Sequence, residues 1–257
     1  MSMDYSVEGS IATVAFNRPE RKNAMNDEMR RGIGDLFEQI SMDDSVRAVI
    51  LTGRGGAFCA GADVSGMGGK DVGTGRRKLA WGAHRGIRSV FRLDKPVIAA
   101  VEGPAAGIGW SYALACDFVV AAEDAKFVCA HHKVGLAADG AAIWFLTRRI
   151  GMGQAKRLVY SARVLSGTEA FQMGLVDEVV KPGSVMEAAK ALAAEMASGP
   201  TFAVAMSKAM FAASDNSSFE DYLALEQMAQ PQVQQTADHA EAVAAFLEKR
   251  KANFIGR

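Results

Sequence analysis

Two short segments combine small side chains with positions where a strand should give way to a helix. The first is Ala57–Asp63, with the sequence AFCAGAD, and the second is Glu102–Gly109, with the sequence EGPAAGIG. The N-terminus of a helix presents unpaired N–H groups and a partial positive charge, so either segment could hold an anionic oxygen. The same glycines and alanines would also suit tight packing of a strand against a helix. The spacing alone leaves both interpretations open.

Asp139 and three histidines are the side chains best suited to acid–base chemistry. Asp139 precedes a helical stretch at 141–150, where an aspartate would also serve as a helix cap. His84 lies on a helix with several arginines, a pattern typical of a solvated face. His131 and His132 are adjacent, so in an extended segment they would face opposite sides, and one of them would line a pocket.

Serine and thiol chemistry are both disfavoured by the local pattern. Residues 109–113, GWSYA, imitate the hydrolase motif G-x-S-x-G, but the last glycine is missing and no strand leads directly into Ser111. We therefore expect Ser111 to be a small polar pocket residue. Cys59, Cys116 and Cys129 form no CxxC motif and are expected to be buried, reduced thiols. No pair of His, Cys or carboxylate residues has metal-ligand spacing, so no metal is predicted.

The composition restricts the class of protein. The chain has 257 residues, 29 basic and 29 acidic, and 49% of its residues are hydrophobic. A net charge of zero argues against a nucleic-acid binder, and the apolar fraction argues against disorder. The longest mostly apolar run, Val97–Val101, is too short to span a membrane, and no signal peptide is recognised. We expect a soluble, cytoplasmic globular protein.

Strand and helix patterns alternate as far as residue 185, and only helical patterns follow Pro200. This order predicts an α/β core with a helical appendage. Asn26 is expected to cap the first helix, and the S-x-x-E sequences at Ser166 and Ser184 predict capping boxes. Strands are expected at 5–8, 11–16, 46–51, 97–101, 118–121 and 127–129, and helices from 27, over 76–95, over 141–150 and after Gly151.

Six further motifs are NRPERKNA (17–24), FCAGAD (58–63), KPVIAAVEG (95–103), CD (116–117), AKF (125–127) and FLEKRKANF (246–254). Taken together and in chain order, they resemble the crotonase superfamily, which includes enoyl-CoA hydratases, isomerases and acyl-CoA dehalogenases. The resemblance covers essentially the whole chain. It implies a spiral of repeated ββα units over residues 1–195 and a helical segment over 196–257 that assembles a homotrimer, often paired into a hexamer. It also implies an acyl-CoA substrate, with no cofactor other than the coenzyme A that the substrate carries.

The resemblance also assigns binding roles. The backbone N–H groups of Ala62 and Ile108 match the two donors of an oxyanion hole, which stabilises the charge that develops on a thioester oxygen. Lys251 and Phe254 match a C-terminal pair that reaches a CoA, in many members the CoA of a neighbouring subunit. The remaining CoA contacts that the resemblance implies are Arg21, Lys22, Ala24, Ala60, Asp63 and Val64.

The acid–base positions depart from those of the hydratases. The two hydratase glutamates align with Ser111 and His131, so hydration by the standard mechanism is not expected. Asp139 stands at the position of the catalytic carboxylate in isomerases and of the nucleophilic aspartate in 4-chlorobenzoyl-CoA dehalogenases. In the dehalogenases a histidine base falls at His84, and a supporting tryptophan is replaced here by His131.

The sequence therefore predicts an isomerase in which Asp139 is the base, acting on an enolate held by two backbone amides. One alternative is a dehalogenase-like substitution with Asp139 as nucleophile, His84 as base and His131 in place of the tryptophan. The other is a non-catalytic homologue that binds CoA or RNA, although the zero net charge disfavours RNA.

Overall fold

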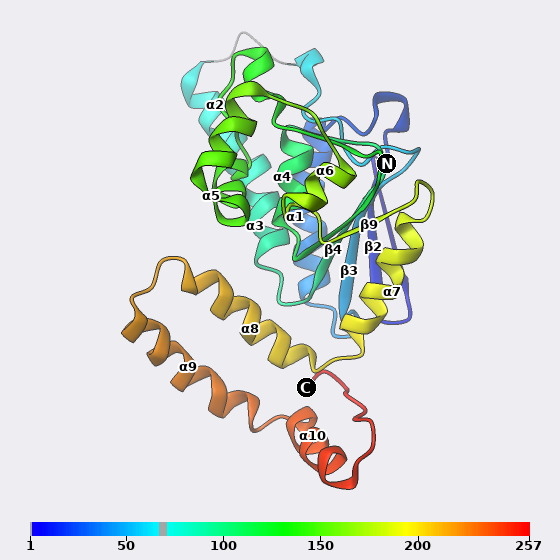
Figure 1. Ribbon diagram of the computed structural model, residues 1–257, viewed down its shortest axis with the longest axis vertical. Helices are drawn as coiled ribbons and strands as arrows, with labels where there is room; N and C mark the ends of the chain where they lie inside the picture. The colour runs from blue at the N-terminus through cyan, green and yellow to red at the C-terminus, as the bar shows by residue number, and fades with distance from the viewer. Residues whose placement is uncertain (1, 67–70) are drawn as a thin grey trace.

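Runs of apolar residues form the parallel strands at the centre of the molecule (Figure 1). The computed structural model describes residues 2–66 and 71–257. Its main sheet has the order β1-β2-β3-β4-β6-β9, in which only β1 and β2 pair antiparallel. The strands expected at 5–8 and 11–16 form an antiparallel hairpin, with Gly9 and Ser10 at its turn. The strands are β1 (Met3–Glu8), β2 (Ile11–Phe16), β3 (Ala48–Gly53), β4 (Val97–Val101), β6 (Phe118–Ala122) and β9 (Glu178–Val180).

A second, small sheet lies beside the first and places part of the site. It contains β5 (Pro104–Ala106), β7 (Lys126–Val128) and β8 (Leu165–Ser166). The sequence predicted β7 but missed β5, β8 and β9, because two or three residues are too few to show an alternating pattern. The mixed α/β class predicted from the sequence is confirmed.

The first helix, α1 (Asp27–Ser41), forms as predicted, with Asn26 Oδ1 accepting a hydrogen bond from the N–H of Met29 at 2.8 Å. The helix predicted over 76–95 consists of three consecutive pieces. These are α2 (Val72–Lys78), the π-helical turn η3 (Leu79–His84) and α3 (Arg85–Phe91). Apolar residues spaced along these pieces form the inner face, where Ala83 and Val90 are buried.

The middle of the chain forms four helices: α4 (Ile108–Ala115), α5 (Ala142–Ser161), α6 (Gly167–Gln172) and α7 (Val185–Ala197). Gly151 interrupts α5 with φ 74°, which confirms the two helices predicted there. The capping box at Ser166 is present. The one predicted at Ser184 is wrong, because Ser184 has helical backbone angles and a capping residue needs extended ones.

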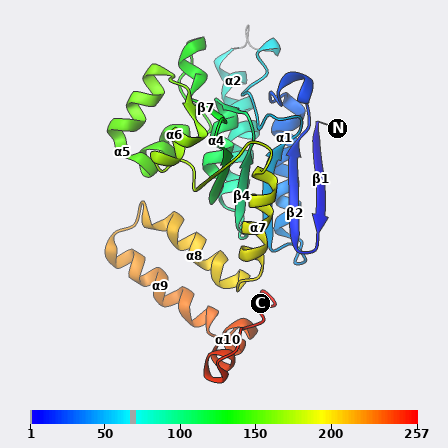
Figure 2. The same ribbon diagram turned by 45° about the vertical axis from the view of Figure 1, so that its right-hand side comes forward.

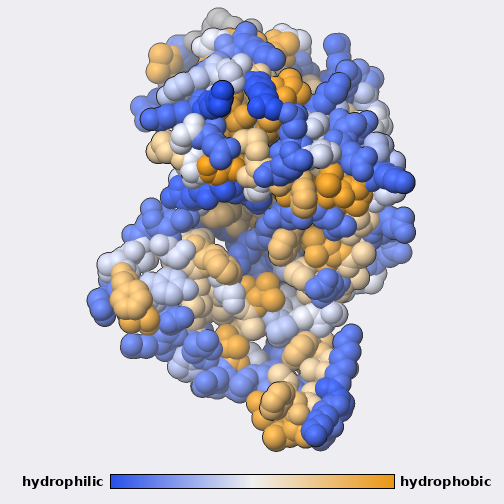
Figure 3. Space-filling view, in the orientation of Figure 1, coloured by the Kyte–Doolittle hydropathy of each residue, from blue (hydrophilic) through white to orange (hydrophobic). Residues whose placement is uncertain are grey.

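Three helices finish the chain: α8 (Thr201–Ser214), α9 (Phe219–Val233) and α10 (Ala237–Glu248). They extend away from the sheet, on the side opposite α2, in both ribbon views (Figures 1 and 2). The predicted domain boundary at residues 195 and 196 falls in the last turn of α7. Helix α8 is largely apolar yet buries none of its residues. Figure 3 shows hydrophobic side chains at the surface of this region.

None of the described helices is long and apolar enough to cross a lipid bilayer.

Candidate functional site

The two small-residue segments lie side by side. The N–H of Cys59 donates to the carbonyl of Pro104, and the N–H of Ala106 donates back to the carbonyl of Cys59, each at 2.9 Å. Gly109, in the first turn of α4, packs directly on this pair, because a Cβ at that position would lie 2.3 Å from the Cys59 carbonyl oxygen. The close packing that these glycines allow therefore places the start of α4 against residues 59–62.

Two backbone amides at the ends of these segments lack the partners that regular structure would supply. Met25 forms a parallel bridge with Ala62, in which it bonds to Gly61 and Asp63. Since N–H groups alternate sides along an extended chain, the N–H of Ala62 faces away from Met25. Ile108 is the first residue of α4, so its N–H has no acceptor within the helix.

A cavity of about 560 Å³ brings these amides together with a carboxylate. Ala62, Ile108 and Asp139 all line it, and its other walls include α1, residues 75–83 and Leu136. The structure thus brings together three of the residues that the sequence singled out, from three separate segments. Such a cavity is large enough for a small organic ligand.

Asp139 is held at this cavity by contacts on both its side chain and its backbone. Its Oδ1 lies 3.0 Å from Nε2 of His131, and its carbonyl accepts a hydrogen bond from Ser111 Oγ at 3.1 Å. The carboxyl group is 39% exposed, whereas the His131 side chain is 8% exposed. Asp139 does not cap α5 as the sequence suggested. Ala141 occupies the capping position instead, with φ 60° and no side-chain bond.

The two adjacent histidines have separate environments, as predicted, although for another reason. The prediction that one of them lines the pocket is wrong, because neither lines the cavity. They belong to a short 3₁₀ helix, η4 (Ala130–Val134), and not to an extended segment. His131 is buried beside Asp139, and His132 is exposed and stacks on the ring of Tyr160.

Ser111 does not line the cavity. It is fully buried in α4, and its hydroxyl reaches the backbone carbonyls of Gly107 and Asp139. A backbone carbonyl cannot remove its proton, so the geometry gives no support to a nucleophilic serine. The prediction that Ser111 is a small polar pocket residue is therefore wrong, because Ser111 lies behind the cavity wall.

Two further carboxylates line the cavity, and both interact with cations. Asp63 pairs with Arg18 at 3.0 Å, and Asp27 pairs with Lys78 at 2.8 Å. Hydrogen bonds from Ser65, together with Arg18, lower the pKa of Asp63 to about 2. Asp63 is therefore held as an ion and is unsuited to accept and release a proton near neutral pH.

The segment predicted to meet CoA lies next to the first small-residue segment. The N–H of Ala60 donates to the carbonyl of Lys22 at 2.9 Å, and Arg21 and Lys22 are exposed. Buried Asn23, which sequence reasoning missed, fixes this contact by donating to the carbonyls of Arg54 and Ala57. Arg21, Lys22, Ala24, Ala60, Asp63 and the exposed Val64 thus belong to one region of the surface.

The cavity is also not lined by Lys251, Phe254 or His84. Lys251 and Phe254 border a different hollow, between the C-terminal segment and the β1–β2 turn. Both ribbon views place the C-terminus on the side of the sheet away from α2 (Figures 1 and 2). His84 is exposed, and its neighbour Ala83 lines the cavity instead.

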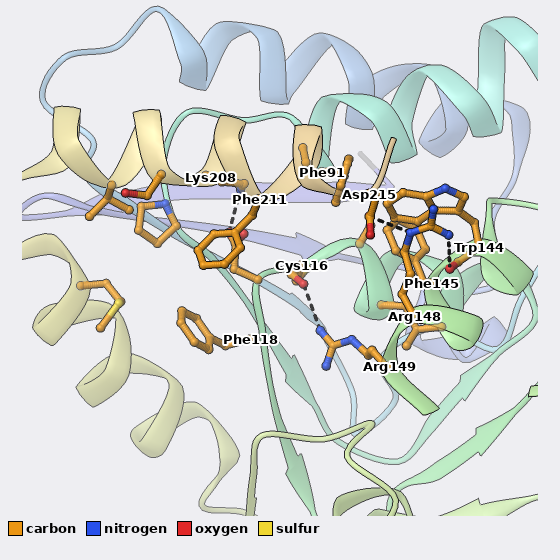
Figure 4. Close-up of a pocket in the computed structure, with 18 residues that line it drawn as sticks. Phe91, Cys116, Phe118, Trp144, Phe145, Arg148, Arg149, Lys208, Phe211 and Asp215 are labelled. Carbon is orange, nitrogen blue, oxygen red and sulfur yellow. Dashed lines mark hydrogen bonds and ion pairs between the residues drawn. The ribbon is translucent and has the colours of Figure 1, made fainter. Parts of the chain in front are cut away.

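A second cavity, of about 540 Å³, separates α8 from the core (Figure 4). Its lining is mainly apolar and includes aromatic rings such as Trp144 and Phe211, and both of its carboxylates are engaged in ion pairs. Lys208 pairs with Asp117 and Arg148 pairs with Asp215, each at 2.7 Å. The Arg148 guanidinium also stacks 3.7 Å above the ring of Trp144. These contacts fasten α8 to the core and leave no carboxylate available for acid–base chemistry.

The thiols are buried, as the sequence predicted. Burial raises the pKa of Cys59 and of Cys129 to about 12, and that of Cys116 rises as well. Within the described residues, no cluster of three His, Cys, Asp or Glu side chains could hold a metal ion.

Comparison with known proteins gives consistent matches along the whole chain. A family model described as enoyl-CoA hydratase/isomerase matches residues 6–257. The 1,2-epoxyphenylacetyl-CoA isomerase of Escherichia coli K12 is 36% identical over 255 residues, which cover 98% of this chain and 97% of that protein. The short-chain-enoyl-CoA hydratase of Clostridium acetobutylicum is 37% identical over 246 residues, with 95% and 94% covered. The crystal structure of an enoyl-CoA hydratase from Bacillus anthracis superposes with a TM-score of 0.94 at 31% identity, over 100% of both chains.

Proposed function

The chain belongs to the enoyl-CoA hydratase/isomerase family, and from this premise we propose that it isomerises a double bond or a ring in an acyl-CoA thioester. The observation that carries the proposal is the support around Asp139. Ser111 and His131 stand where the crotonase resemblance places the two hydratase glutamates, and both bond to Asp139. One supported carboxylate replaces two catalytic ones, which suits a reaction that needs a single base.

In the proposed mechanism the thioester oxygen accepts hydrogen bonds from the N–H groups of Ala62 and Ile108. Negative charge grows on this oxygen as the carbon next to the carbonyl loses a proton. Donors already fixed in place stabilise that charge without reorganising, and removing one such donor typically costs about 3–4 kcal/mol of transition-state stabilisation.

Asp139 then acts as the base that moves the proton. Its carboxylate removes a proton from one carbon of the acyl chain, and the electron pair forms the enolate. The same proton returns to another carbon, so that the double bond changes place and the composition of the substrate does not change. With its Nε2 protonated, His131 donates to the carboxylate and fixes its orientation.

The alternative reactions lose support in this geometry. A dehalogenase-like substitution would need His84 near the Asp139 nucleophile, but His84 is exposed and does not line the cavity. A homologue that only binds CoA would not need a carboxylate opposite two amides. We therefore favour isomerisation over both.

A product assay with a small panel of thioesters tests the proposal. We expect 3-enoyl-CoA substrates to be converted to their conjugated isomers, with no hydration of 2-enoyl-CoA and no chloride release from 4-chlorobenzoyl-CoA. Chloride release would instead assign the dehalogenase reaction, and 3-hydroxyacyl-CoA would assign a hydratase. Tight CoA binding without any turnover would indicate the non-catalytic homologue.

We also propose that the chain assembles as a homotrimer, or as a hexamer of two trimers, through α8. This helix is apolar but buries none of its residues within the chain, and its Phe211 is 77% exposed. Sedimentation is expected to give three or six times the chain mass, because other copies would cover this face. Phe211→Glu should lower that mass, whereas Met42→Glu, an exposed position after α1, should not. A monomer in the unmodified protein would contradict the proposal.

A further inference from the structure

Three buried side-chain atoms lack a hydrogen-bond partner among the described residues, namely Arg30 Nε, Tyr112 Oη and His131 Nδ1. Of these residues, only Arg30 lines the cavity that contains Asp139. An arginine stays charged at any physiological pH, and a buried donor without an acceptor is unfavourable. This feature of the cavity is not used by the mechanism proposed above.

The surroundings of Arg30 hold it in place and give it one long ion pair, with Asp27, but no hydrogen-bond acceptor for its Nε among the described residues. Helix α1 is linked to the facing segment, residues 72–91, by an ion pair between Asp27 and Lys78 at 2.8 Å. A second tie is made by Arg85, whose guanidinium bonds Asp35 and Glu38 at 2.7 Å.

Arg30 lies on α1 between these two ties, and its stem packs against Gly82 of η3. Its nearest recorded carboxylate oxygen is Oδ1 of Asp27, at 3.9 Å from Nη1, which is beyond hydrogen-bond distance. The two other carboxylates that line the cavity are engaged elsewhere, Asp63 with Arg18 and Asp139 with His131.

We infer that Arg30 determines substrate specificity by binding a carboxylate at the far end of the acyl group. The preferred substrates would then be thioesters of dicarboxylic acids, with CoA at one end and a free carboxylate at the other. This inference rests on the proposed function. The Arg30 side chain is 23% exposed although its Nε is buried, and the two Nη groups at the end of its planar guanidinium match the two oxygens of a carboxylate.

A phosphate group of CoA has the same chemistry as the carboxylate and would also bind a guanidinium. The two possible contacts of Arg30, with a carboxylate or with a phosphate, predict different effects on the affinities of the ligands. A carboxylate contact affects only ligands that carry the second acid group, whereas a phosphate contact affects every CoA derivative equally.

Calorimetric titration with saturated thioesters separates these cases, because such ligands cannot be isomerised and binding is read without turnover. The matched pairs are glutaryl-CoA with valeryl-CoA, and adipyl-CoA with hexanoyl-CoA. In at least one pair, we expect the unmodified protein to bind the thioester with a terminal carboxylate about tenfold more tightly than the thioester without one. Arg30→Met should remove that difference and leave the affinity for the uncharged thioester and for free CoA unchanged.

Arg31→Met is the matched control. It removes the same charge from the next residue of α1, which is exposed and does not line the cavity, and it should keep the preference. Thermal melting of both variants should match that of the unmodified protein, so that a loss of binding is not a loss of folding.

The inference is overturned if the unmodified protein binds both members of each pair equally. It is also overturned if Arg30→Met weakens the binding of valeryl-CoA and of free CoA as much as the binding of glutaryl-CoA, because Arg30 would then bind a phosphate. In both cases the thioesters still bind and the proposed function stands. A failure to bind any thioester would remove the proposed function and this inference together.

Discussion

Replacing Asp139 by alanine is expected to lower kcat by roughly 10²–10⁴-fold, the usual contribution of a positioned general base. Asp139 is the carboxylate that shares the cavity with Ala62 and Ile108 and whose recorded side-chain partner is a histidine instead of a fixed cation. The affinity for a saturated acyl-CoA should change only a few-fold, because the amides that bind the thioester oxygen remain. Isomerisation rates and calorimetric titration on the same preparation measure both quantities.

The choice of variants at this position matters. Asp139→Asn keeps the shape and the contact with His131, but it places an asparagine before Gly140, a pair that deamidates and restores a carboxylate. Mass spectrometry of the assayed sample must therefore accompany it. Asp124→Asn, in the exposed turn before β7, is the control and should retain full activity. If Asp139→Ala keeps its activity, the base is another residue and the mechanism is wrong.

Gly109→Ala is expected to lower the free energy of unfolding by about 3 kcal/mol, the upper end for overpacking in a dense core. The added methyl would meet the Cys59 carbonyl oxygen at 2.3 Å and the Cys59 Cβ at 2.7 Å. Relief of this overlap must move α4 away from residues 59–62, so Ile108 and Ala62 separate. Urea denaturation measures the loss of stability, and isomerisation by the folded fraction should fall as well.

Gly153→Ala is the control for this change. Gly153 lies in α5, and a Cβ there would meet no atom within 4 Å. Alanine favours a helix over glycine by roughly 1 kcal/mol, so this variant should be as stable as the unmodified protein or more stable. If Gly109→Ala is as stable as the unmodified protein, the two segments are less tightly packed than the structure indicates.

The spacing of apolar residues predicted the long helices and strands well. The residue types at helix starts failed to predict the helix caps, because a single backbone angle decides which residue caps a helix. The inner faces of α1 and α3 follow directly from apolar spacing. Asp139 and Ser184 both have the residue type of a helix cap, yet neither caps. Ala141 takes the capping position after Asp139 with a left-handed φ, and Ser184 is already helical. Neither backbone angle is visible in a residue pattern.

The sequence predicted the main residues of the site but not how they are supported. Motifs located Ala62, Ile108 and Asp139, which the structure brings to one cavity. The bond between His131 and Asp139 depends on the 3₁₀ helix that contains His131, which is too short to show a sequence periodicity. Arg30 was missed because one arginine on the polar side of an amphipathic helix looks like a solvated residue until the facing segment is known.

The burial of all three native thiols has a practical consequence. A single cysteine introduced at the cavity would be the one thiol open to a maleimide dye, since the others are shielded and protonated at neutral pH. Leu136 suits this purpose, because it lines the cavity and is 46% exposed. A fluorophore attached there would report the arrival of each ligand in stopped-flow recordings, before any chemical step.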